Sequence, residues 1–511
     1  MKLYKYISIL SLLAFVLGFT SCSKDLDFDA YNKTPETVYW ATASDAQTAV
    51  IACYGKLVDW PFFEPTTFAL EEIASDNTAK GSTVDDQTDV NLVKNFTFTP
   101  SLTIFNTFWK SRYSAINVCN QAITHIPDIK MDETDKKQLL GEARFIRAWL
   151  YFELVRIYGE VIIYNGLPDN NNYNISKSPI DSVYSFIVRD LEYGIGSMKS
   201  TAWSSEWKGR VNAWTAKALL AKVRAYMASG AHFAGHAILG TTWSDVKALT
   251  DDLIRNGPYR LHTSDGANSY YQQFRMANEN NEESILEAQC GASKVAGSIN
   301  RSAFAVYQWV RGMSGWGFNV PSDTLLSVWE ARTDDAIRYH ASVIFRGETL
   351  PDGTLVEGDA TLSGTNAGSA GYKPARYNYK VYVPAAEDAG LTWMYGAAQN
   401  PRLFRFSDIL LLDAEAELNL GNEAAALTSI NLVRDRVKEN VLSSLTMQQI
   451  WDERRFELAF ENDRFFDLVR TGQAAGVLAR QGFKSPKNNF YPVPQEQIDL
   501  SGGPLKQNSL Y

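Results

Sequence analysis

The chain of 511 residues carries 49 Lys and Arg against 58 Asp and Glu, which gives a formal net charge of −9. An acidic chain without a basic stripe is a poor candidate for binding nucleic acid, and its length allows one large core or two or three ordinary domains. The cysteines beyond residue 22 (Cys53, Cys119 and Cys290) lack CxxC spacing, so neither a metal knuckle nor a redox pair is indicated.

The first 21 residues have the build of a signal peptide. Lys2 and Lys5 precede an apolar run over 6–19. This run is too short to span a bilayer as a helix, and the positive flank is typical of a secretory leader. We therefore expect residues 1–21 to be removed from the mature protein.

The leader ends at Cys22, and the residues around this cysteine look like a lipobox. Small residues precede a lone Cys, whose thiol is diacylated in such signals and becomes the mature N-terminus. We expect lipid on Cys22 and a mobile lipidated tether over 22–36. The segment 23–27, which contains Asp25 and Asp27, resembles the acidic signal that sends such lipoproteins to the cell surface. An ordinary signal peptide cleaved nearby is the alternative.

Helical periodicity dominates the next two hundred or so residues. Ser44 is the expected N-cap of the first helix, and the polar run 78–91 reads as a loop. Apolar residues at helical spacing predict long helices over 104–125, 133–158, 180–191 and 211–228, of which the first is stopped by Pro127 and the second by Gly159.

The pattern changes between residues 241 and 400. Residues 282–289 read as a strand, 312–321 form a loop of Gly and aromatic residues, and 347–371 hold six Gly without hydrophobic period. We interpret 241–400 as a loop-rich subdomain with a few short strands, inserted into a helical scaffold that runs over 37–240 and 401–511.

Three helices are predicted near the C-terminus. The first covers 401–420 and ends at Gly421, and the second carries an apolar stripe over 426–437. Because the connection is short, the two should pack antiparallel. Thr446 can cap the third helix, with Gln449 at the capping-box position, and this helix is expected to continue to Gly472.

The sequence of these C-terminal segments resembles the SusD/RagB family. Three consecutive motifs carry the resemblance: RF-x-DILLLDAEAELNLG, then INLVRDR, then ERRFELAFENDRFFDLVRTG. Residues 142–148 and the tail after Tyr491 also resemble the family. Asn462 and Phe465 stand where the family commonly has Gly and Trp. The family consists of outer-membrane lipoproteins that capture nutrients, usually glycans, for a partner transporter.

The resemblance implies a mainly α fold. Helix pairs near 44–75, 104–158, 180–228 and 404–438 would form a tetratricopeptide-like scaffold of about four hairpins, on which the loop-rich insertion sits.

Carboxylates of the third C-terminal helix are candidate catalytic groups. Glu453, Glu457 and Glu461 share a helix face, as the paired carboxylates of a glycosidase could. The interleaved Arg454, Arg455, Arg464 and Arg470, with Glu461–Arg464 and Asp467–Arg470 at i+3 spacing, favour ion pairs that tie helices together.

A metal site and an enzyme are both disfavoured. His232 and His236 have a metal spacing, but no third histidine accompanies them, and Gly230 and Gly235 favour a loop. The chain lacks a nucleophile elbow, a P-loop and a dinucleotide fingerprint. We therefore expect no catalytic residues, no metal and no cofactor.

Aromatic loops are the better candidates for a site. Trp60 precedes Pro61-Phe62-Phe63, and Trp309, Trp316 and Phe318 surround a Gly-rich turn. A flat indole can cover the C–H face of a pyranose, and polar neighbours such as Asn77 and Arg311 can bind the hydroxyls. The predicted ligand-binding residues are Trp60, Asn77, Trp309 and Trp316. The alternative is that they are ordinary buried residues.

With the resemblance, these residues predict a lipid-anchored outer-membrane protein that faces the cell exterior. It would capture an oligosaccharide and deliver it to a SusC-like TonB-dependent transporter. A peptide-binding, RagB-like member of the same family is the first alternative. A surface glycoside hydrolase is the second.

Overall fold

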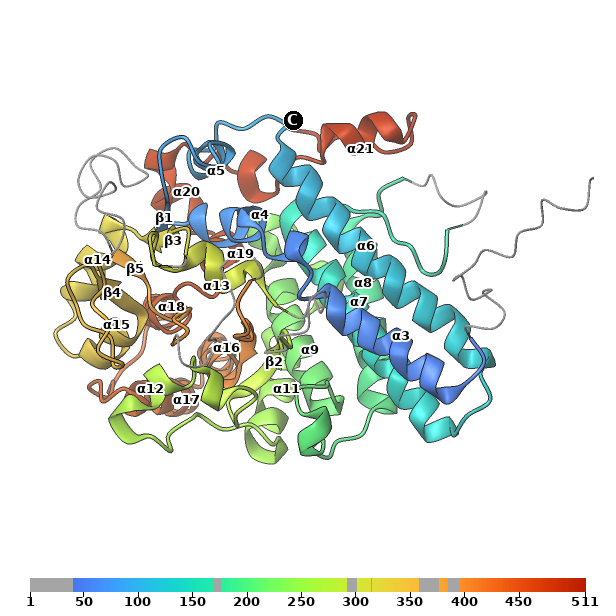
Figure 1. Cartoon of the computed structure of the whole chain (residues 1–511), viewed down its shortest axis with the longest axis horizontal. Coiled ribbons are helices and arrows are strands. Elements are labelled where there is room, and N and C mark those ends of the chain that lie inside the picture. Colours follow the sequence, from blue (N-terminus) through green and yellow to red (C-terminus); the bar gives the residue numbers. More distant parts are fainter. Residues whose placement is uncertain (1–39, 169–175, 292–300, 314, 358–375, 385–395) are drawn as a thin grey trace, which may run out of the picture.

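The computed structural model describes residues 40–168, 176–291, 301–313, 315–357, 376–384 and 396–511 (Figure 1). The predicted signal peptide, Cys22 and the tether lie outside these residues, as does much of the Gly-rich stretch 347–371. Among the described residues, no helix combines the length and the apolar character needed to cross a bilayer.

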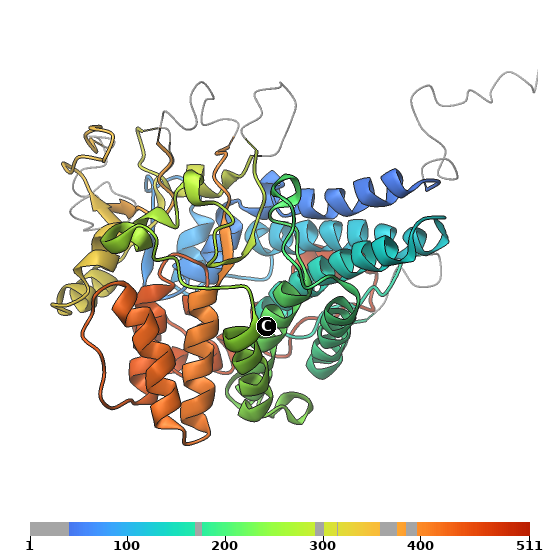
Figure 2. The same cartoon turned by 90° about the horizontal axis from the view of Figure 1, so that it is seen from below.

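Five long helices form the N-terminal part of the scaffold, and neighbours in this series pack against one another (Figures 1 and 2). They are α3 (Ala43–Lys56), α6 (Thr103–His125), α7 (Glu133–Tyr158), α8 (Ile180–Ser197) and α9 (Ala213–Ala228). The predicted helices 104–125 and 133–158 are confirmed to within one residue. Asp132 caps α7, and Gly159 ends it with a φ of 72°. The cap of α3 is Thr42, not Ser44, because Thr42 and Asp45 form a capping box.

The segment between α3 and α6 contains several short helices and a strand. It contains the turns and short helices η1 (Trp60–Phe62), α4 (Pro65–Phe68), the π-helical turn η2 (Ala69–Ile73) and α5 (Asp89–Lys94). The prediction of a loop over 78–91 is wrong at its start, where β1 (Thr78–Gly81) pairs antiparallel with β3 (Phe318–Pro321). The four residues of β1 show no strand pattern of their own in the polar run, and their partner lies far along the chain.

Within the segment 241–400, interpreted as a loop-rich insertion, helix α11 (Trp243–Asn256) packs against α9 and α16 of the scaffold. The expected strand within 282–289 is confirmed as β2 (Ser284–Glu287). The rest of the insertion contains η7 (Met276–Asn278), α12 (Ser269–Gln272), α13 (Ala303–Gln308), β3, α14 (Asp323–Glu330), α15 (Ala336–Ser342), β4 (Val343–Phe345) and β5 (Arg376–Asn378), which pairs with β4.

The C-terminal part completes the scaffold with an antiparallel pair, α16 (Phe406–Asn419) and α17 (Glu423–Arg436), followed by short helices (Figure 2). The prediction of a helix over 401–420 is wrong for its first turn, because β6 (Arg402–Arg405) pairs with β2. Backbone groups that a helix would satisfy internally are here satisfied across the sheet. Later short helices include α20 (Ala474–Val477) and α21 (Gln495–Leu500).

The third C-terminal helix is also shorter than predicted. It is capped by Thr446 as expected, but α18 ends at Glu457 and α19 (Arg464–Arg470) is separate. Between them Phe460 and Asn462 have φ values of 68° and 65°, a left-handed backbone that a helix cannot contain. Glu461 therefore lies in a turn and does not continue the helical face of Glu453 and Glu457.

Candidate functional site

The structure brings two of the predicted site residues together around a third aromatic residue. The ring of Tyr307, in α13, lies 5.8 Å from that of Trp60 and 4.6 Å from that of Trp316. Both tryptophans are half-buried, whereas Tyr307 is buried. We call Trp60, Tyr307 and Trp316 the aromatic cluster. It joins η1 of the scaffold to the loop between α13 and β3.

Close backbone packing fixes the loop that carries Trp316. A Cβ atom on Gly315 would lie 2.4 Å from the Trp309 carbonyl oxygen, and one on Gly81 would lie 2.1 Å from that of Gly317. The Ser82 N–H donates to the Gly317 carbonyl at 2.7 Å. The two glycines beside the β1–β3 pair therefore permit a tight approach, and Trp316 is presented from a constrained loop rather than a free one.

Charged groups lie beside Gly317, next in the chain to Trp316. Arg311 Nη1 donates to Ser82 Oγ at 3.1 Å and lies 3.5 Å from Asp86 Oδ2. Ser82 Oγ in turn donates to the same carboxylate oxygen at 2.8 Å. The side chains of Arg311 and Asp86 are each 30% exposed, so both reach solvent from a fixed position. Ser82 and Asp86 were missed because nothing in the polar run 78–91 distinguishes them from ordinary loop residues.

Tyr307 is a neutral hydroxyl at physiological pH. Burial raises its pKa to about 12, and the nearby carboxylate of Glu64 adds to the rise. The hydroxyl therefore keeps its proton and can act as a hydrogen-bond donor within the aromatic cluster.

The other two predicted ligand-binding residues are enclosed by protein. Asn77 is 0% exposed, and its side-chain oxygen accepts a hydrogen bond of 2.8 Å from Arg455 Nε. Trp309 is 8% exposed, and its ring lies 5.1 Å from that of Tyr382 in the core of the insertion. Direct contact of Asn77 or Trp309 with a ligand stays a prediction. For Asn77 the burial is unfavourable, because none of its surface is exposed.

The carboxylates of the C-terminal helices form a buried ionic network, as the interleaved arginines predicted. Glu457 is 0% exposed and lies 2.9 Å from Arg405 and 3.1 Å from Arg338, which hold its pKa well below the usual range together with Arg436. Glu453 lies 2.8 Å from Arg338. With several guanidinium partners and no access to solvent, these carboxylates are unsuited to exchange protons with a substrate.

The two predicted i+3 pairs have different outcomes. Asp467 and Arg470 are paired at 2.7 Å, which confirms that prediction. Arg464 instead lies 2.9 Å from Asp76, and Glu461 pairs with Arg405 at 2.6 Å and with Lys380 at 2.7 Å. The break between α18 and α19 rotates Glu461 away from Arg464, so the pair expected for a continuous helix does not form.

The two histidines with metal spacing serve different contacts. His236 pairs with exposed Asp181 at 2.7 Å, while His232 lies in the short helix α10 (Gly230–Phe233) against Gly472.

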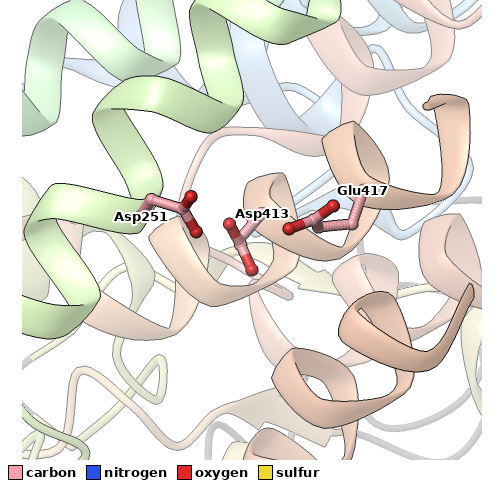
Figure 3. A group of neighbouring side chains, drawn as sticks. All are labelled: Asp251, Asp413 and Glu417. Atoms are coloured by element: carbon pink, nitrogen blue, oxygen red, sulfur yellow. The ribbon is translucent and has the colours of Figure 1, made fainter. Parts of the chain in front are cut away.

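Within the described part of the chain, one group of carboxylates is close enough to hold a metal ion: Asp251 of α11 with Asp413 and Glu417 of α16 (Figure 3). The Lys247 ammonium lies 2.7 Å from Asp251 and 2.5 Å from Glu417, so a lysine already supplies the positive charge. Asp413 accepts from Thr250 and Ser429 at 2.6 and 2.5 Å.

A cavity, which we call the α6–α21 cavity, lies away from the aromatic cluster. Its volume is about 460 Å³, and it is bounded by one face of α6, by residues 162–168 and by α21. Two of its polar lining residues already form hydrogen bonds within the protein: Tyr113 donates to the Ile162 carbonyl, and Asn120 donates to the carbonyls of Tyr164 and Gly166. This cavity shares no lining residue with the aromatic cluster and offers a ligand mainly apolar surface.

Two family models match this chain, one over its N-terminal part and one over the insertion and the C-terminal part. Residues 257–511 match the family described as "SusD family", and residues 26–225 match "Starch-binding associating with outer membrane". SusD-like protein P2 of Formosa agariphila is 26% identical over 100% of this chain and 98% of its own length. A SusD-like protein of Bacteroides ovatus is 27% identical over 71% of this chain and 64% of its own length.

Solved structures agree with this assignment. A laminarin binding SusD-like protein superposes with a TM-score of 0.77 at 25% identity, covering 92% of this chain and 100% of that one. The mainly helical fold with few short strands is the one expected from the C-terminal motifs. The chain therefore belongs to the SusD/RagB family.

Proposed function

We propose that this protein captures oligosaccharides at the aromatic cluster. The observation that carries the proposal is the convergence of Trp60 and Trp316 on Tyr307, with Arg311 and Asp86 held beside the same loop. An indole face covers the C–H face of a pyranose at little entropic cost, and a guanidinium and a carboxylate can donate to and accept from its hydroxyl groups.

The similarity to a laminarin binding protein supports a glycan over other nutrients. Two half-buried platforms and a short polar edge suit an extended sugar chain, of which each unit contributes a few kcal/mol at most. Affinity should therefore be modest and should rise with chain length.

The protein would act on the cell surface as a carrier. Cys22 would anchor it in the outer membrane, and the bound chain would pass to a SusC-like TonB-dependent transporter. The family that matches the N-terminal part, which is known for association with the outer membrane, supports this location. Chemistry would be left to separate enzymes, since the carboxylates of α18 are enclosed and paired with arginines.

The test is calorimetric binding of a panel of oligosaccharides and peptides to the protein lacking residues 1–22. Trp60→Ala and Trp316→Ala should each weaken glycan binding about tenfold, the equivalent of one lost aromatic contact. Asn117→Ala is the matched control. Asn117 is exposed and lines the α6–α21 cavity, so its substitution should leave the affinity for glycans unchanged.

Three results would change the proposal. Loss of binding in Asn117→Ala alone would indicate that the glycan binds in the α6–α21 cavity. Binding of peptides but not glycans would favour the RagB-like alternative. A large fall in melting temperature with unchanged affinity in both tryptophan variants would make these residues part of the core.

A further inference from the structure

A buried lysine lies at the centre of the loop that borders the proposed site. Lys80, in β1, is 1% exposed, and its ammonium group donates to the Thr83 carbonyl at 2.6 Å and also to the Asp86 carbonyl. On its other side the group lies 5.6 Å from the centre of the Phe318 ring. The chain from residue 82 to residue 87 is thus wrapped around one positive charge.

The backbone of this loop needs such a contact. Ser82 and Gln87 have φ values of 53° and 47°, in the left-handed region that non-glycine residues seldom adopt. Residues of this kind keep that conformation where surrounding contacts determine it. At one end the Ser82 N–H is bound by the Gly317 carbonyl, whereas carbonyls inside the loop are bound by Lys80.

The loop carries the groups that orient the polar edge of the site. Asp86 accepts from Ser82 at 2.8 Å, and both side chains contact Arg311. Lys80 holds the backbone of Asp86 while Asp86 holds Arg311, so a displacement of the loop would release the guanidinium as well.

The charges around Lys80 come from this loop and from the Trp316 loop. Burial lowers its pKa to about 8, Asp86 and Asp85 oppose that change, and Arg311 adds to it. The group is therefore still mainly an ammonium ion at neutral pH, which suits its contact with two carbonyl oxygens.

We propose that Lys80 is a positioning residue for glycan binding: it holds the 82–87 loop closed and thereby fixes Asp86 and Arg311 beside Trp316. The positioning role rests on the proposed function, whereas the holding of the loop does not. The two parts can be tested separately.

Hydrogen exchange of the purified protein tests the first part without a ligand. Lys80→Met keeps an unbranched apolar chain and removes the charge, so amide exchange over 82–87 should rise about tenfold or more. Lys80→Arg keeps a charged donor and should restore part of the protection. Lys80→Gln, a neutral donor, serves if the Met variant does not fold.

Lys94→Met is the matched control. Lys94 donates to the carbonyls of Ser75 and Thr78, before the loop, so its loss should raise exchange there and leave 82–87 protected. Unchanged exchange over 82–87 in Lys80→Met would overturn the proposal, whatever the binding result.

A double-mutant cycle on the best glycan of the panel tests the positioning role. Lys80→Met and Arg311→Ala should each weaken binding about tenfold, and the double variant should lose little more than either alone. Additive losses would mean that Lys80 does not act through Arg311. If the loop opens in Lys80→Met but affinity is unchanged, the positioning role is wrong. If the wild type binds no glycan, the proposed function and the positioning role fall together, while the exchange result still decides how the loop is held.

Discussion

Glu72 accepts a hydrogen bond of 3.1 Å from the backbone N–H of Asn462, although 390 residues separate the two in the chain. Its other carboxylate oxygen accepts from the Phe460 N–H at 3.3 Å. The π-helical turn η2 thus supplies acceptors to the turn that separates α18 from α19. A contact between the first and last parts of the chain stabilises the break in the C-terminal helix.

Glu72→Ala should therefore destabilise the protein. Glu72 is 0% exposed, and its removal leaves the buried N–H of Phe460 and the half-buried N–H of Asn462 without an acceptor, at a cost of about 2–4 kcal/mol in the free energy of unfolding. Chemical denaturation measures this difference. Asn462→Gly keeps the N–H and suits a φ of 65°, so it should retain or raise stability. Equal stability of Glu72→Ala and wild type would show that the turn is held by other contacts.

The pH dependence of stability should contain a contribution from Glu71. Burial raises the pKa of this carboxyl to about 8, Glu153 adds to the rise, and Arg156 opposes it. Because the folded pKa is above the unfolded value, the folded state keeps a proton that the unfolded chain releases. The resulting stability is present below about pH 4.5 and is lost as pH rises through about 8.

Glu71→Gln removes this titration while keeping the shape of the side chain. The variant should melt at about the same temperature as the wild type at pH 5. At pH 9 it should be more stable than the wild type, by on the order of 4 kcal/mol in the free energy of unfolding, and should melt at a higher temperature. Melting curves at the two pH values decide the matter. A constant difference between variant and wild type at both values would mean that Glu71 is ionised throughout.

Glu457 and Glu461 should be structural. Removing either takes one carboxylate away from buried Arg405, which keeps Glu283, and the loss of one partner in such a buried ionic network should cost about 3 kcal/mol. Glu457→Ala and Glu461→Ala should therefore lower the melting temperature. Lys438→Ala is the control, because the Lys438 and Asp435 side chains are 63% and 75% exposed, and such pairs contribute about 0–1 kcal/mol. Normal folding of Glu461→Ala with loss of a measurable hydrolytic activity would instead support the glycoside hydrolase.

Cys22→Ala should release the protein from the membrane fraction. The expectation comes from the apolar run that follows Lys2 and Lys5 and ends at Ser21-Cys22. Fractionation and metabolic labelling with a fatty acid measure anchoring and acylation. Membrane attachment that persists in the variant would favour an anchor at another position.

The limits of α6 and α7 could be predicted from the sequence to within one residue because local signals mark their ends, whereas α8 runs to Ser197, beyond the predicted end at 191. Helix α7 begins after a capping Asp132 and ends at a glycine with positive φ, and its apolar periodicity is continuous. Strands β1 and β6 could not be predicted in this way. Each has four residues, and what makes it a strand is its pairing with a distant strand of the insertion, which the local pattern of β1 or β6 does not reveal.

The candidate site was predictable in part for a similar reason. Trp60 and Trp316 stand next to Pro or Gly in loops, and this context separates them from core tryptophans. Trp309 has nearly the same context, but its ring packs on Tyr382, a residue about which the local sequence says nothing. Ser82 and Asp86 become noticeable once Arg311 is placed beside them.

The pairing of β2 with β6 brings Glu287 opposite Arg402, so the chain between them leaves the scaffold and returns to it at neighbouring points. A segment attached in this way can be exchanged between related genes without altering the length or order of the scaffold helices. Its other contacts with the scaffold include the ion pairs of Arg338 with Glu453 and Glu457, and the packing of the apolar side of α14 against Phe456. A grafted segment that supplies these contacts, together with a strand for β1, should be accepted and could bring a new ligand preference with it.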